Sequence, residues 1–252
     1  MSESRLRFED AGVTHAGKVR ANNEDAFLSR PGQRLWTVAD GMGGHDDGEW
    51  ASQCIVERLA AAELGEGFDA DVTRVADAIH AANAAIHAEC EAADKRMGST
   101  VVALLIEGPR FAVFWVGDSR VYLLRDGQIV RLTKDHSQVQ AMVDAGQLTL
   151  EEAAAHPMSN VITRAVGVAE ELELDAILDE AEPGDVFVLC SDGLTDVAAD
   201  ADIAATLAGK APEVAAQALL DLTLDRGAPD NVSIVVVACA EATAASAERV
   251  EP

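Results

Sequence analysis

The sequence predicts an α+β fold in which antiparallel β-sheets are covered by helices on their outer faces. Short apolar runs, which are typical of strands, are joined in pairs by the tight turns 107–110 and 126–127. Connections this short force antiparallel pairing, because parallel strands need a long crossover. The amphipathic segments lie between groups of strands and do not alternate with single strands. The pattern therefore differs from that of a doubly wound parallel sheet.

The spacing of apolar residues predicts the individual elements. In residues 70–93 apolar side chains recur every three or four positions, which places them on one face of a helix. Similar spacing predicts helices over residues 47–64 and 213–224. Short apolar runs bounded by turn residues predict strands over residues 34–39, 101–107, 111–116, 121–125, 129–132, 186–190 and 232–238.

No repeat or Pro/Ser-rich linker divides the 252 residues, so one domain is predicted over residues 1–240. Residues 241–252 are polar and lack apolar periodicity, which predicts a C-terminal tail. No run approaches the ~20 apolar residues of a membrane-spanning helix, and the N-terminus lacks the apolar core of a signal peptide. Single cysteines in apolar surroundings, with no C-x-x-C spacing, indicate reduced thiols and a cytoplasmic protein: Cys54, Cys90, Cys190 and Cys239.

The chain is strongly acidic, with 44 Asp and Glu against 19 Lys and Arg and a net charge of −25. Such a surface repels nucleic acids and anionic lipids, so neither is expected as a partner. A basic peptide would be attracted, although the excess charge can also serve solubility alone.

Three acids stand where predicted strands end or begin. Asp40-Gly41 follows one apolar run, Asp192-Gly193 follows Ser191 after another, and Asp230 precedes the last strand. Carboxylates at strand ends are held rigidly yet stay open to a ligand, and several of them together suit Mg²⁺ or Mn²⁺. The alternative for any single Asp-Gly pair is a plain turn, which we expect for Asp126-Gly127.

A second group of charges lies in the segment 20–25. Arg20 stands beside Glu24 and Asp25 in a stretch without a clear period. A guanidinium binds phosphate oxygens bidentately, while carboxylates hold a metal or its waters. The alternative is a solvated charged loop. The chain has neither a G-x-S-x-G nor an H-E-x-x-H motif, and His45 and His136 are the histidines that lie next to these segments.

The residues in these segments resemble the type-2C metal-dependent protein serine/threonine phosphatases (the PPM family) in their compact, free-standing bacterial form. The resemblance covers roughly residues 8–240 and rests on seven motifs that occur in family order. They are G-K-V-R-A-N-N-E-D at 17–25, A-D-G-M-G-G-H at 39–45, G-S-T at 98–100, G-D-S-R at 117–120, D-H-S at 135–137, S-D-G-L at 191–194 and G-A-P-D-N-V-S at 227–233.

The resemblance implies a four-layer α-β-β-α sandwich with two central antiparallel sheets flanked by helices. By similarity, Asp40 would bridge two Mn²⁺ or Mg²⁺ ions, with the Gly41 carbonyl, Asp192 and Asp230 as further ligands. Glu24 would bind through water, with Asp25 in support. Arg20 would bind the substrate phosphate, and Asp118 with Asp192 would hold a third metal. Ser159 and Asn160 lie where relatives reach toward this third metal. His45 is a candidate for protonating the leaving group.

The implied activity is hydrolysis of phosphoserine and phosphothreonine by a water between two divalent cations. The implied partners are phosphorylated proteins and a bacterial Ser/Thr kinase, and a monomer is expected. Segment 136–163 corresponds to the family's flap, and its acids Asp144, Glu151 and Glu152 predict a preference for basic flanks. Two alternatives remain, namely a phosphatase of another phosphoester or regulatory phosphoprotein and a catalytically silent module that binds phosphoproteins.

Overall fold

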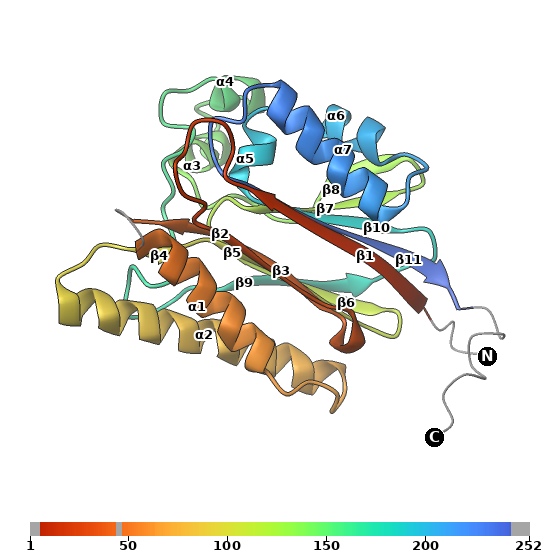
Figure 1. Ribbon diagram of the computed structural model, residues 1–252, viewed down its shortest axis with the longest axis horizontal. Helices are drawn as coiled ribbons and strands as arrows, with labels where there is room; N and C mark the ends of the chain where they lie inside the picture. The colour runs from red at the N-terminus through yellow and green to blue at the C-terminus, as the bar shows by residue number, and fades with distance from the viewer. Residues whose placement is uncertain (1–5, 44–46, 243–252) are drawn as a thin grey trace.

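Two antiparallel sheets stack at the centre of the computed structural model, which describes residues 6–43 and 47–242. Helices α1 (Asp47–Ala61) and α2 (Phe68–Ala93) cover one outer face. Helices α5 (Asp192–Thr195), α6 (Asp200–Leu207) and α7 (Pro212–Asp225) cover the other. Figure 1 shows the resulting four layers, with α7 at the top and α2 at the bottom. The predicted α-β-β-α sandwich is confirmed.

The strands of both sheets pair only in antiparallel fashion among the described residues. One sheet has the order β1 (Leu6–His15), β11 (Val232–Glu241), β10 (Val186–Cys190), β7 (Arg120–Arg125) and β8 (Gln128–Arg131). The other has the order β2 (Asp25–Arg30), β3 (Leu35–Met42), β5 (Val101–Glu107), β6 (Arg110–Val116) and β9 (Asp175–Glu180), with the short β4 (Gly98–Ser99) paired to β3. A 3₁₀ turn, Pro31–Gln33, joins β2 to β3.

Both faces of the central strands are buried, which explains their uninterrupted apolar runs. In β3, Trp36 and Val38 pack between the two sheets, while Leu35 and Ala39 pack under α1 and α2. In β11 the same alternation sends Val235 between the sheets and its neighbours toward α7. Successive side chains of a strand point to opposite faces, so a strand inside four layers needs apolar residues at every position.

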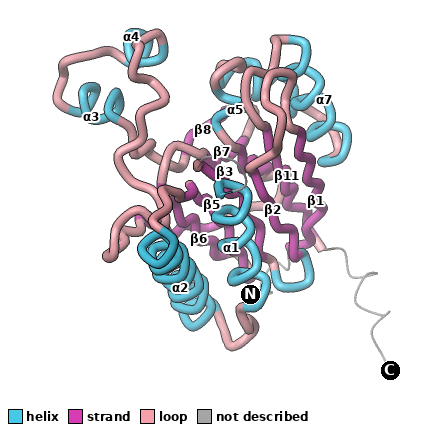
Figure 2. The backbone as a smooth tube through the Cα atoms, turned by 60° about the vertical axis from the view of Figure 1, so that its left-hand side comes forward, coloured by secondary structure: helices cyan, strands magenta, loops and turns pink. Residues whose placement is uncertain are grey.

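Several elements lie outside the sequence-based prediction. Strands β1, β2 and β9 and the short helices α3 (Gln138–Asp144), α4 (Leu150–Ala154), α5 and α6 were not expected. Figure 2 shows α3 and α4 set apart from the two sheets. Strand β1 carries several charged residues, yet it pairs with β11 along ten residues. Strand β11 ends at Glu241, and residues 243–252 of the expected tail lie outside the described residues. No helix in the described ranges is long and apolar enough to cross a membrane.

Candidate metal centre

The antiparallel register gathers three acids from one sheet at a single edge. Cys190, at the end of β10, pairs with Ile234 near the start of β11 and with Arg120 at the start of β7. The residues just beyond these strand ends therefore meet. They are Asp192, Asp230 and Asp118, which all line one cleft.

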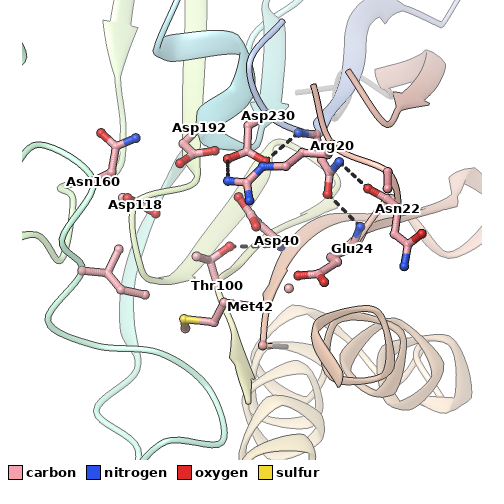
Figure 3. Close-up of a pocket in the computed structure, with 15 residues that line it drawn as sticks. Arg20, Asn22, Glu24, Asp40, Met42, Thr100, Asp118, Asn160, Asp192 and Asp230 are labelled. Atoms are coloured by element: carbon pink, nitrogen blue, oxygen red, sulfur yellow. Dashed lines mark hydrogen bonds and ion pairs between the residues drawn. The ribbon is translucent and has the colours of Figure 1, made fainter. Parts of the chain in front are cut away.

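The second sheet contributes Asp40, which lies near the end of β3. Its backbone is fixed by Thr100, whose Oγ1 accepts from the Asp40 amide at 3.1 Å and whose own amide donates to the Asp40 carbonyl at 2.8 Å. The hydroxyl of Ser99 donates to the same carbonyl at 2.9 Å. The acids, Arg20 and Thr100 surround a cavity of about 490 Å³ (Figure 3).

Burial and mutual repulsion disfavour the state in which all of these acids are ionised. Burial, followed by the nearby charges of Asp25, Asp192 and Asp118, raises the pKa of Asp40 well above its usual value. Burial and then the Asp118 charge raise the pKa of Asp192 in the same direction. Divalent cations would remove this repulsion by supplying positive charge between the carboxylates.

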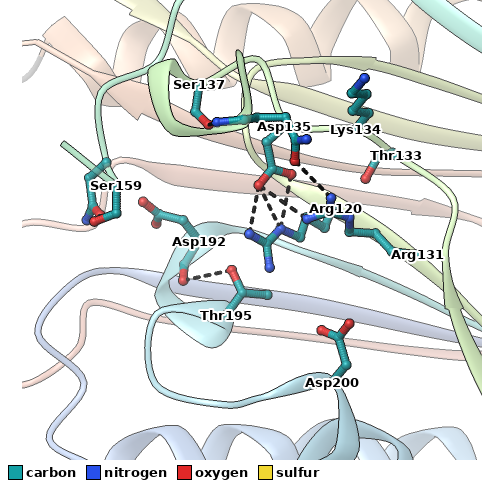
Figure 4. Close-up of polar contacts among 12 residues, drawn as sticks. Arg120, Arg131, Thr133, Lys134, Asp135, Ser137, Ser159, Asp192, Thr195 and Asp200 are labelled. Atoms are coloured by element: carbon teal, nitrogen blue, oxygen red, sulfur yellow. Dashed lines mark hydrogen bonds and ion pairs between the residues drawn. The ribbon is translucent and has the colours of Figure 1, made fainter. Parts of the chain in front are cut away.

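An ion pair between Arg120 and Asp135 stabilises the segment next to the acids (Figure 4). Arg120 donates to both carboxylate oxygens of Asp135, with the shortest distance 2.7 Å, and the Asp135 side chain is 8% exposed. Burial and the Asp135 charge raise the pKa of Asp118 to about 6, and Arg120 opposes the shift. The pair therefore fixes the start of β7, on which the position of Asp118 depends.

The segment before β2 brings Arg20 and Glu24 to the opposite side of the cleft. Arg20 Nη2 donates to Asp230 Oδ2 at 2.6 Å. Asn231 ties this segment to the start of β11, because its Oδ1 accepts from the Glu24 amide at 2.8 Å. Its Nδ2 donates to the carbonyls of Ala16 at 3.0 Å and Asn22 at 2.8 Å. Asn231 thus holds both ends of the segment that presents Arg20.

A close approach of two backbones requires glycine at position 41. A Cβ on Gly41 would lie 2.0 Å from the Gly48 carbonyl oxygen and 2.6 Å from that of Glu24. The Gly41 amide donates to the Glu24 carbonyl at 3.1 Å. Gly41 therefore packs the end of β3 against both α1 and the Arg20 segment, next to Asp40.

The donor set suits hard divalent cations. Carboxylate oxygens surround the cleft, and Asp192 Oδ1 is buried without a hydrogen-bond partner, which leaves an acceptor for a ligand. In residues 6–43 and 47–242, no three His, Cys, Asp or Glu side chains are grouped as they would be around one ion. Arg20 instead provides the positive charge beside Asp230. Binding of cations would therefore require small side-chain adjustments in the cleft.

Most of the residues predicted from sequence line this cleft, and two do not. The lining includes Arg20, Glu24, Asp40, Gly41, Asp118, Asn160, Asp192 and Asp230. Asp25 lies behind it, 8% exposed, and its Oδ2 accepts from the Ser191 hydroxyl at 2.7 Å. Ser159 is also outside the lining and donates to Asn160 Oδ1 at 2.7 Å. His45 lies outside the described residues.

Sequence reasoning gave no role to Asn231, Thr100 or Asn22. All three lie within the motifs quoted above, and all three line the cleft. Asn160 connects the flap to the helical side, because its Nδ2 donates to Asp196 Oδ2 at 3.0 Å. A single sequence shows none of these contacts, since their partners are distant in the chain.

The acids of the flap are largely engaged within the flap and its base. Asp144 forms an ion pair with Lys134 at 2.6 Å and accepts from Gln140 at 3.0 Å. Glu152 completes a capping box with Thr149 at the start of α4. Glu151 is exposed beside it. An ion pair therefore offsets the charge of one of the three acids, Asp144, and the preference for basic flanks stays a prediction.

Comparisons with known proteins agree with this arrangement. The profile of the family described as protein phosphatase 2C matches residues 11–222. The serine/threonine protein phosphatase PstP of Mycobacterium tuberculosis is 42% identical over 238 residues, which are 94% of this chain and 46% of that protein. The chain thus spans about half the length of this curated relative.

Solved structures show the same fold. The crystal structure of the M. tuberculosis phosphatase PstP/Ppp superposes with a TM-score of 0.88 at 41% identity, covering 93% of this chain and 99% of that one. The catalytic domain of PstP in complex with two manganese ions gives a TM-score of 0.84 at 40% identity, covering 94% of this chain and all (100%) of that one. The chain belongs to the protein phosphatase 2C family.

Proposed function

We propose that this chain is a metal-dependent protein phosphatase that hydrolyses phosphoserine and phosphothreonine in proteins. The observation that carries the proposal is the convergence of Asp40, Asp118, Asp192 and Asp230 on one cleft with Arg20. Family membership and the serine/threonine phosphatases among its relatives support it.

Asp40, the Gly41 carbonyl, Asp192 and Asp230 would hold two Mn²⁺ or Mg²⁺ ions, with Glu24 assisting through water. A relative whose structure contains two manganese ions supports this number. Asp118 with Asp192 is our candidate for a third ion, to which Asn160 and Ser159 are near. Bound divalent cations activate a water nucleophile and offset the charge of the phosphoryl oxygens.

The protein's own groups would bind and orient the phosphoester. Arg20, 58% exposed and within the cleft, can exchange its Asp230 partner for phosphate oxygens, which a guanidinium binds bidentately. Thr100 and Asn231 keep Asp40 and the Arg20 segment in place. Asp25, buried under the acids, supports the site from below through Ser191. His45 stays a candidate for protonating the leaving group, which a comparison of leaving groups of different pKa in His45→Gln would test.

The experiment measures hydrolysis of a phosphothreonine peptide with Mn²⁺, Mg²⁺ or EDTA, for the unaltered protein and for Asp192→Asn. We expect turnover that needs a divalent cation and falls at least ~100-fold in Asp192→Asn. Asp77→Asn, on the exposed face of α2, makes the same chemical change away from the cleft and should retain full turnover. Absence of turnover from folded protein with every cation would favour a silent phosphoprotein-binding module and refute the proposal.

The wider assignments belong to the same proposal. We assign the catalytic domain to residues 1–240, a monomeric state, a cytoplasmic location and an opposing Ser/Thr kinase. The four cysteines are unpaired, which agrees with a reducing compartment. Light scattering would test the monomer. The pairing would be tested in cells that lack this phosphatase, where the sites that the kinase phosphorylates should stay phosphorylated.

A further inference from the structure

A second cavity, of about 580 Å³, opens beside the acidic cleft and has a different chemical character. Its apolar lining includes Met42, Met97 and Val168, with Cys90 between them. Met42 and Gly43 line both cavities. A peptide that leaves the acidic cleft across Met42 therefore enters the second cavity directly. We call this second cavity the α2 groove, because its outer side is the C-terminal end of α2.

Two side chains of the α2 groove, Met42 and Val168, approach each other beside Gly98. A Cβ built on Gly98 would lie 2.9 Å from Val168 Cγ2 and 3.3 Å from Met42 Cε, so both side chains approach the same point. Val168 is 61% exposed, whereas Met97 is 4% exposed. Val168 therefore supplies exposed apolar surface of the groove, and Met97 lies buried beneath it.

The groove is built before any ligand arrives. Asn83 of α2 accepts from the Gly167 amide at 2.6 Å and donates to the carbonyls of Ala169 at 2.9 Å and Glu170 at 3.1 Å. Val166 forms a two-sided backbone bridge with Ser99. The wall that carries Val168 is therefore fixed on both sides, which lowers the entropic cost of binding.

The rim of the α2 groove is cationic at one place on a strongly acidic protein. Lys95 and Arg96 follow the end of α2 and line the groove, which also has one acid, Glu91, in its lining. Lys95 pairs with Asp47 at 2.8 Å, whereas exposed Arg96 forms no hydrogen bond or ion pair with the residues that the structure describes. Its guanidinium can therefore pair with a ligand carboxylate.

We propose that the α2 groove binds an apolar side chain of the phosphorylated protein substrate, with an acidic substrate residue beside it on Arg96. The proposal rests on the proposed function, since it extends the path of the peptide away from the phosphate. Continuity with the cleft through Met42 and the charge of Arg96 point to this occupant.

The test uses phosphothreonine peptides in which one Leu, followed by one Glu, is moved a position at a time through an otherwise constant sequence. In the unaltered protein with Mn²⁺, one placement should raise kcat/KM about 10-fold through a lower KM, because one apolar group in a pocket discriminates by 10-fold or more. The rate of hydrolysis of the small ester p-nitrophenyl phosphate measures the activity of the acidic cleft without a contribution from the α2 groove.

Val168→Asp should abolish the advantage of that placement and leave p-nitrophenyl phosphate hydrolysis within about twofold. Arg96→Glu should invert the preference from Glu to Lys beside the Leu. The matched control is Val214→Asp on α7, where a valine of similar exposure, 57%, is changed outside the groove. This control should keep the full advantage.

Equal kcat/KM for all placements, or an advantage that survives Val168→Asp, would overturn the inference while leaving the phosphatase activity intact. An equal loss on peptide and small ester in Val168→Asp would also overturn it. If the unaltered protein forms dimers and Val168→Asp makes them dissociate, the occupant of the groove is a second copy of this chain and not the peptide. Hydrolysis of neither substrate would overturn the proposed function itself, and the inference with it.

Discussion

Asn231 is the residue on which the Arg20 side of the cleft depends, and Asn231→Ala should separate this role from a general effect on stability. The side chain, 7% exposed, makes three hydrogen bonds to the backbone of residues 16–24. Asn83 offers a matched comparison, because it is 2% exposed and also makes three backbone hydrogen bonds. Its bonds hold residues 167–170, none of which lines the acidic cleft.

Each lost hydrogen bond costs about 1 kcal/mol, so either alanine variant should lose about 3 kcal/mol of unfolding free energy. In a chain of this size that loss corresponds to a melting temperature lower by about 6–12 °C. Only Asn231→Ala releases the segment that carries Arg20 and Glu24. Loss of a group that orients a metal ligand typically weakens metal affinity about 10–100-fold.

The assay has two parts. Melting in EDTA measures stability without a metal contribution, and Mn²⁺ titration of p-nitrophenyl phosphate hydrolysis measures the apparent metal affinity and the rate. We expect equal destabilisation of both variants, with weaker Mn²⁺ affinity and lower kcat/KM only in Asn231→Ala. Should Asn231→Ala keep metal affinity and rate within twofold while melting as early as Asn83→Ala, the assignment of Asn231 would be wrong.

Three further predictions address the charge, the backbone and the boundary of the site. Burial raises the pKa of Asp118 to about 6 from its usual 3.8, so in metal-free protein this carboxyl stabilises the fold most below about pH 4 and loses that contribution as pH rises through 6. Cations need the ionised form, and the rise in melting temperature on adding Mn²⁺ should therefore be smaller at about pH 5.5 than at about pH 7.5. A Cβ at Gly41 meets two backbone oxygens, so Gly41→Ala should abolish Mn²⁺ binding measured by calorimetry, whereas Gly32→Ala, in open space, should not affect it. A chain ending at Ala242, just beyond β11, should melt and hydrolyse phosphopeptide like the full chain, and a loss above twofold would place residues 243–252 in the site.

The predicted core of the fold depended on strands buried on both faces. Their continuous apolar runs over residues 101–107, 186–190 and 232–238 agree with β5, β10 and the first part of β11 within a few residues. Strand β1 has no such run, because it lies at the end of its sheet beside only β11. Its ten-residue pairing with β11 is a long-range property that local sequence does not encode.

The acids of the site were predictable for a related reason. Asp40, Asp192 and Asp230 each stand at the end of a strand that the sequence already marked, and the antiparallel register then brings them together. Asp118 follows Gly117 between two such strands. Asn231, in a loop, and Asn83, within α2, were not predictable, since an asparagine has the same local sequence whether it faces solvent or holds a distant backbone segment.

Glu24 and Asp25 are neighbours in the chain, and this difference of one position decides which of them lines the cleft. The sequence places both acids beside Arg20, and only the family resemblance gives them different roles. Asp25 is the first residue of β2, paired with Asp40, and the pleat turns its side chain inward to Ser191. Glu24, one position earlier, lines the cleft. Burial raises the pKa of Asp25 to about 6, and its Oδ1 has no hydrogen-bond partner, so its ionised form is disfavoured until positive charge enters above it. Glu24 would therefore act on cations from the cleft, while Asp25 would act on them indirectly, through Ser191 and the field beneath Asp40.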